Sequence, residues 1–160
     1  MKQLGELLVN DYMTHQAICV EDTDRLTQAI RTMDDNELSV LPVVNDKGNL
    51  VGILSASDLI EITHEIQADI SALTYVTDKT REFLIQLLMD QGDTTLVRDV
   101  MTSGVETTTT STNLVLAAKL LVNRNYHHLP VVDDSGKPIG VLATSDFVRA
   151  VSDYGALLAG

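Results

Sequence analysis

The residues of this sequence that could do acid–base, nucleophilic or metal chemistry are few. Its four histidines, too few for a histidine-rich metal site, are His15, His64, His127 and His128. Its two pairs of adjacent aspartates fall at an expected helix end (34–35) and in an expected turn (133–134), where solvation explains them. The sequence lacks the G-x-S-x-G, Walker, H-E-x-x-H and C-x-x-C motifs. We therefore expect no enzyme activity, no catalytic residue and no metal site.

Two carboxylates stand at expected helix starts, in the segments Ser55-x-x-Asp58 and Ala143-x-x-Asp146. Free backbone N–H groups and the helix dipole make such a position favourable for anionic groups. Serine and aspartate are also good helix caps, so a purely structural role is the alternative.

These two segments belong to an internal repeat. Residues 9–60 align without a gap on residues 97–148, a shift of 88 positions. VNDYMT falls on VRDVMT, LPVVNDKG on LPVVDDSG, and VGILSASDL on IGVLATSDF. Matches concentrated in turns and apolar runs indicate two copies of one supersecondary unit.

Each copy is expected to fold in the order β-α-β-β-α. In the first copy, a short extended run near 17–20 precedes a helix over about 24–36, whose apolar face carries Leu26, Ala29, Ile30 and Met33. The runs 40–44 and 50–54 predict a hairpin in which Gly48 supplies a positive φ, and a second helix starts at 55–58. The fold class is therefore α/β (α+β).

The insert between the copies predicts amphipathic helices. Its expected apolar stripes are Ile62, Ile66, Ile70 and Leu73, and then Phe83, Leu84, Leu87 and Leu88 before a helix end at Gly92. A helical connector packed on the repeats is the simpler interpretation, and a partner-binding surface is the alternative.

Composition sets further limits. The net charge is −12 and no Lys/Arg cluster is present, which argues against binding to a nucleic acid polymer. No run approaches the roughly 18 apolar residues of a membrane span, so no membrane association is expected. Cys19 is the only cysteine, which favours a reducing compartment, and the cytoplasm is the expected location.

The pattern D-x-M-T, a helix, and then L-P-V-V-[ND]-D-x-G-x-x-x-G-h-h-x-x-S-D, where h is apolar, resembles the CBS-domain family. The resemblance covers repeats at 6–64 and 94–152, separated by a helical connector at 65–93. It implies a stand-alone CBS pair, or Bateman module, whose repeats pack with pseudo-twofold symmetry and leave two clefts. It also implies an adenosyl ligand such as AMP, ADP, ATP or S-adenosylmethionine, no required cofactor, and a homodimer.

The resemblance assigns site residues as well. The family's ribose acceptor falls on Asp58, assisted by Ser55, while the base-facing apolar residue falls on Ile18. The second copy retains Asp146 but has Ala143 and Glu106 at the other two positions, and a buried unpaired carboxylate there would be costly. His127 and His128 would face the phosphate in the cleft of Asp58, and Tyr126 the base in the other. The full expected set is Ile18, Ser39, Pro42, Ser55, Ser57, Asp58, Tyr126, His127, His128 and Asp146.

Two functions remain open at this point. The first is a sensor that binds an adenosyl metabolite in the Asp58 cleft and acts on an unknown effector protein. The second is a structural or dimerising module whose clefts are vestigial.

Overall fold

A computed structural model describes residues 4–66, 78–90 and 93–159. The chain forms two compact units: the Asp58 unit, residues 18–105, and the Asp146 unit, residues up to 17 together with those from 106 onward. Each unit contains one sheet and its own helices.

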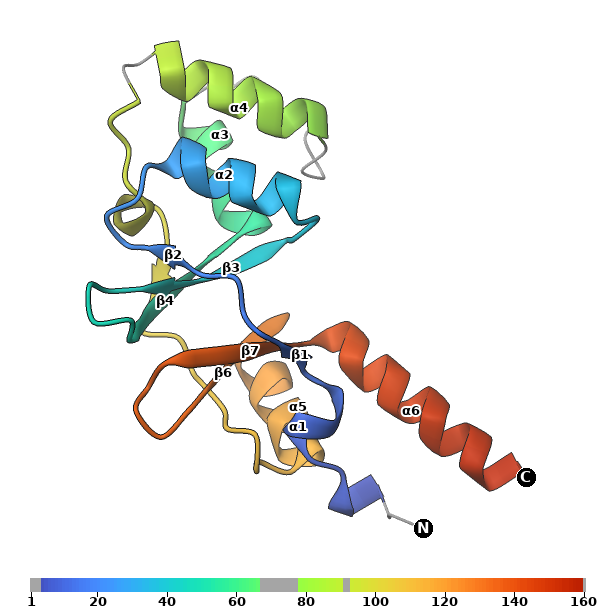
Figure 1. Ribbon diagram of the computed structural model, residues 1–160. Coiled ribbons are helices and arrows are strands. Elements are labelled where there is room, and N and C mark those ends of the chain that lie inside the picture. The colour runs from blue at the N-terminus through green and yellow to red at the C-terminus, as the bar shows by residue number, and fades with distance from the viewer. Residues whose placement is uncertain (1–3, 67–77, 91–92, 160) are drawn as a thin grey trace. The chain divides into compact units, whose positions relative to one another are not determined.

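The Asp58 unit has a four-stranded sheet in the order β2-β3-β4-β5. Its strands are β2 (Val20–Glu21), β3 (Val40–Val44), β4 (Leu50–Ser55) and β5 (Thr102–Ser103). Strand β2 is parallel to β3, and the other pairs are antiparallel. Its helices are α2 (Leu26–Asp35), α3 (Ala56–Ile66), α4 (Asp78–Asp90) and the short η2 (Val97–Asp99). Figure 1 shows α2, α3 and α4 on one side of the sheet.

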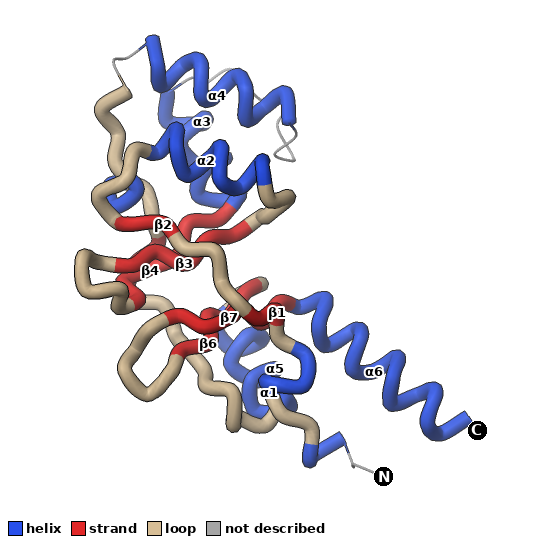
Figure 2. The backbone as a smooth tube through the Cα atoms, in the orientation of Figure 1, coloured by secondary structure: helices blue, strands red, loops and turns tan. Residues whose placement is uncertain are grey.

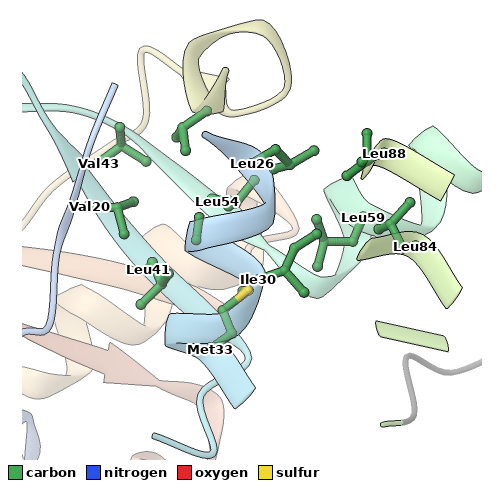
Figure 3. Packing of buried hydrophobic residues seen from close by; sticks show 12 residues of the cluster. Val20, Leu26, Ile30, Met33, Leu41, Val43, Leu54, Leu59, Leu84 and Leu88 are labelled. Atoms are coloured by element: carbon green, nitrogen blue, oxygen red, sulfur yellow. The ribbon is translucent and has the colours of Figure 1, made fainter. Parts of the chain in front are cut away.

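The core of the Asp58 unit lies between this sheet and its helices (Figure 3). The predicted apolar face of α2 is confirmed, because its four members are all fully buried. They pack with side chains of the strands, namely Val20, Leu41, Val43 and Leu54. Burial of each large aliphatic side chain stabilises the fold by roughly 1.5–3 kcal/mol.

The Asp146 unit repeats this plan with a three-stranded antiparallel sheet in the order β1-β7-β6. Its strands are β1 (Thr14–His15), β6 (His128–Val132) and β7 (Pro138–Ala143), and its helices are η1 (Leu4–Glu6), α1 (Val9–Tyr12), α5 (Leu114–Arg124) and α6 (Thr144–Ala159). Figure 2 shows the strands and helices of each unit by colour. None of the helices in the described ranges is both long and apolar enough to cross a membrane.

Both predicted hairpins are present. Strand β3 pairs with β4, and β6 with β7, each with a register shift at the equivalent residue. Gly48 has the expected positive φ of 76°, and Gly136 repeats it with 80°. The side chain that opens each turn accepts backbone N–H groups: Asn45 in one hairpin and Asp133 in the other. The turns are thus built alike.

Helix α4 packs on the Asp58 unit. Leu84 and Leu88 are buried in its core, whereas Phe83, predicted to share their stripe, is 42% exposed. The Arg81 guanidinium donates to the Asp34 carboxylate at 3.1 Å and to the Leu38 carbonyl at 3.1 Å. The described part of the insert therefore belongs to the module. The predicted positions Ile70, Leu73 and Gly92 lie outside the described residues.

The boundaries of the two compact units do not coincide with those of the two sequence repeats. We call residues 6–17 the first arm and residues 94–105, their equivalents 88 positions later, the second arm. The first arm opens repeat 1, yet its strand β1 pairs with β7 of repeat 2. The second arm opens repeat 2, yet its strand β5 pairs with β4 of repeat 1. Each unit therefore contains the arm of the other repeat.

Each hairpin contains a glycine whose missing side chain leaves space for the arm that pairs with it. A Cβ atom built on Gly52 would lie 2.6 Å from the Thr102 carbonyl oxygen and 2.9 Å from the Met101 sulfur. Gly140 is equally crowded by the Thr14 carbonyl oxygen and the Met13 side chain. Since Cβ atoms do not approach backbone oxygen so closely, any larger residue must displace the arm.

We expect Gly52→Ala to destabilise the protein by about 1–3 kcal/mol, because the added methyl group overpacks against backbone that cannot rotate away. Gly5→Ala is the control, since no atom lies within 4 Å of a Cβ atom at that position. Urea denaturation of both variants measures the difference. Equal stability of the two variants would show that the arm tolerates displacement.

Candidate functional site

Asp58 lies at the junction of β4 and α3 and is only 9% exposed. Its Oδ2 atom accepts the Ser55 backbone N–H at 2.6 Å and the Ser55 hydroxyl at 2.6 Å. Its Oδ1 atom accepts the Thr102 hydroxyl at 2.8 Å. Two segments far apart in the sequence thus hold one buried carboxylate.

The local sequence explains this placement. Strand β4 ends at Ser55 and α3 begins at the next residue, so Asp58 is the third residue of the helix. A carboxylate at this position reaches back to the N–H of the capping residue. The predicted capping role of Asp58 is confirmed, while the Ser55 hydroxyl donates to Asp58. The same bonds fix the direction of the carboxylate.

Four other predicted residues belong to the Asp58 unit. The Ser39 carbonyl accepts the Ala56 N–H at 2.9 Å, which places Ser39 beside the start of α3. Pro42 is buried within β3, while Ser57 is exposed in the first turn of α3. Ile18 is 39% exposed and so retains apolar surface in contact with solvent.

Asp146 occupies the equivalent place between β7 and α6 and is held differently. Its Oδ2 atom accepts the Ala143 N–H at 2.8 Å, as in the other unit. Its Oδ1 atom accepts from the Arg149 guanidinium at 3.0 Å, in an ion pair whose arginine side chain is 56% exposed. Arg149 also donates to the Tyr12 carbonyl of the first arm. The charge of Asp146 is therefore paired.

The predicted residues of the Asp146 unit differ in their surroundings. His128 pairs with Ala143 across β6 and β7. Its burial, followed by the charge of His127, lowers the pKa of His128, while Asp146 opposes that change. His127 is exposed, and its carbonyl accepts the Thr144 N–H at 3.1 Å. Tyr126 is partly buried against the core of this unit.

Glu106 avoids the cost that a buried unpaired carboxylate would carry at this position. Its side chain is 40% exposed and forms an ion pair with Arg124 at 2.7 Å. A solvated ion pair carries little desolvation cost. Glu106 therefore places no large penalty on this unit.

Sequence reasoning missed two residues that contact the aspartates, Thr102 and Arg149. Thr102 stands in the repeated M-T motif, so the repeat offered a signal for it. Arg149 had none, because the equivalent residue in the first copy is Glu61.

The chemistry available at these positions is hydrogen bonding and charge pairing. Within the described ranges, no group of three or more His, Cys, Asp or Glu side chains is arranged to hold a metal ion. A fixed, buried carboxylate at a helix start is suited to accept hydroxyl hydrogens from a ligand.

Comparisons with known proteins agree with this architecture. The CBS domain family model matches residues 9–65 and 97–153. The Methanocaldococcus jannaschii protein MJ1426 is 36% identical over 159 residues, which cover 92% of this chain and 93% of that protein. The chloroplastic CBS domain-containing protein CBSX2 of Arabidopsis thaliana is 32% identical over 152 residues, and the match spans 91% of this chain but only 64% of CBSX2.

Solved structures show the same fold. The crystal structure of CBSX2 is similar with a TM-score of 0.71 and 31% identity, covering 93% of this chain and 96% of that one. The crystal structure of CBSX2 in complex with AMP gives a TM-score of 0.69 and 29% identity over 92% of this chain and 98% of that one. The chain therefore belongs to the CBS domain family and carries two copies of the domain.

Proposed function

We propose that this CBS pair is a non-catalytic regulatory module that binds an adenine nucleotide through Asp58 and acts on a partner protein. The observation that carries the proposal is the burial and hydrogen bonding of this carboxylate. It is buried and fixed in direction, and no ion pair to it is present among the described residues. A ribose hydroxyl is a donor that can take the acceptor position that Ser55 and Thr102 leave open on this carboxylate.

AMP is the first candidate ligand, because a related chain, CBSX2, has been crystallised in complex with AMP. ADP, ATP and S-adenosylmethionine share the adenosyl group that Asp58 would bind. Ile18, with its exposed apolar surface, would contact the base. Ser39, Pro42 and Ser57 complete the proposed set on this unit.

His127 and His128 are the proposed phosphate contacts, whereas Tyr126 and Asp146 are assigned to the second proposed site, that of the Asp146 unit. Because burial lowers the pKa of His128, this residue is largely neutral near pH 7 and would donate a hydrogen bond to phosphate rather than a full charge.

We also propose that the protein forms a homodimer through its helices. Large apolar side chains are exposed on α5 and α6, including Leu116 (55%), Val122 (79%), Val148 (71%) and Val151 (62%). Apolar side chains exposed on these two helices provide surface that self-association would remove from water. Light scattering should give twice the chain mass, and a monomer mass at all concentrations would contradict the proposal.

The two aspartates should differ in ligand binding. Asp58→Ala should weaken AMP binding about tenfold to a hundredfold, because a ribose hydroxyl loses its charged acceptor. Asp146→Ala should change the affinity much less, since its charge is already paired with Arg149. Isothermal titration calorimetry with AMP measures both effects.

Asp146→Ala is also the control for folding, because it removes the same kind of helix cap as Asp58→Ala. Asp58→Asn adds a second test, since it retains a carbonyl oxygen but loses the charge. Stronger dependence on Asp146 than on Asp58 would reject the assignment of the site. Absence of binding of any adenosyl ligand by the wild type would favour the structural or dimerising module instead.

His128 should make the stability of the protein depend on pH. Its folded pKa is lowered from the ordinary value of about 6.5, so the unfolded chain takes up a proton first as the pH falls. The contribution of His128 to the free energy of unfolding is fully present above pH ~6.5 and declines as the pH falls toward the folded pKa. His128→Val, which introduces the equivalent residue Val40, should remove this decline. Denaturation of both proteins between pH 5 and 8 tests it, and parallel curves would contradict it.

A further inference from the structure

The Thr102 hydroxyl joins the second arm to the candidate ribose acceptor. Thr102 lies on β5 directly opposite Ile53 of β4, and Gly52 allows this close approach. Its hydroxyl reaches the Asp58 Oδ1 atom at 2.8 Å. Thr102 is exposed while Asp58 is buried, so this bond is made at the edge of the solvent-accessible surface.

This contact orients Asp58. The torsion that turns a carboxylate plane is broad and roughly twofold when nothing restrains it. Here Ser55 fills both acceptor positions of Oδ2 and Thr102 takes one of the two positions of Oδ1. Bonds on both oxygens hold the plane, and one acceptor position of Oδ1 is left for a ligand.

The equivalent contact is replaced in the other unit. Thr14 occupies the same place on β1, directly opposite Val141 of β7. Among the described hydrogen bonds, however, the Asp146 Oδ1 atom accepts from Arg149 instead of from Thr14. A guanidinium neutralises the carboxylate that it holds, whereas a hydroxyl orients it and leaves its charge intact.

We propose that Thr102 is a positioning residue for nucleoside recognition, which directs the remaining acceptor position of the Asp58 carboxylate toward the ribose 2′-hydroxyl without neutralising the charge. The proposal rests on the proposed function of Asp58. It assigns the second sequence repeat a part in the ligand site of the first, and it identifies Arg149 as the residue that makes Asp146 unsuitable for a diol.

The test compares AMP with 2′-deoxy-AMP by titration calorimetry on the full chain. Thr102→Val should weaken AMP binding about threefold to tenfold, the effect of one hydrogen bond, and leave the affinity for 2′-deoxy-AMP nearly unchanged. The preference for AMP should therefore fall in this variant. Thr102→Ser should restore it, because serine keeps the hydroxyl. The matched control Thr14→Val should bind both ligands as the wild type does.

Other results would overturn the proposal. A loss of affinity for both nucleotides by the same factor, or a failure of Thr102→Ser to restore the preference, would show that Thr102 only supports the sheet edge. An unchanged preference in Thr102→Val would show that Asp58 needs no such partner. A wild type that binds AMP and 2′-deoxy-AMP equally would instead contradict the ribose-binding role of Asp58 itself.

Discussion

The close approach of an arm to a hairpin glycine is the constraint on which each unit depends. The Thr102 carbonyl occupies space over Gly52 that a side chain would need, and the Thr14 carbonyl does the same over Gly140. Each arm thereby becomes an edge strand of a sheet whose hairpin comes from the other repeat. The chain passes from one unit to the other after residue 17 and again after residue 105, so neither repeat forms a complete sheet alone.

This exchange also determines how the two helix-start aspartates are held. Both cap a helix through a backbone N–H three residues earlier. They differ in the second oxygen, which meets a hydroxyl from the second arm in one unit and an arginine in the other. Pairing a carboxylate with a guanidinium neutralises its charge and makes it a weaker acceptor for ligand hydroxyls, so two units of one fold present different chemistry. Divergence of single residues around a conserved geometry is sufficient to produce this asymmetry.

Much of the fold could be predicted from the sequence. The apolar spacing of Leu26, Ile30 and Met33 predicted α2, and the repeated L-P-V-V and glycine turns predicted both hairpins, because these signals are local. The exchange of arms could not be predicted, since a contiguous repeat gives no sign that the arm at its start pairs with a strand of the other repeat. The exposure of Phe83 was likewise missed because helical spacing does not say how much of a face is covered. At the candidate site, the helix-start position of Asp58 was predicted from its motif, whereas the contact of Arg149 with Asp146 required the three-dimensional neighbours to be known.

The most direct test of the account uses two backbone amides as reporters. The N–H of Ser55 donates to Asp58 and the N–H of Ala143 donates to Asp146, so each amide reports on the carboxylate that it contacts. In ¹H–¹⁵N correlation spectra recorded during addition of AMP, the Ser55 resonance should shift in a saturable manner and by more than that of Ala143. A saturable shift of Ala143 without one at Ser55, or no shift of either amide, would contradict the account.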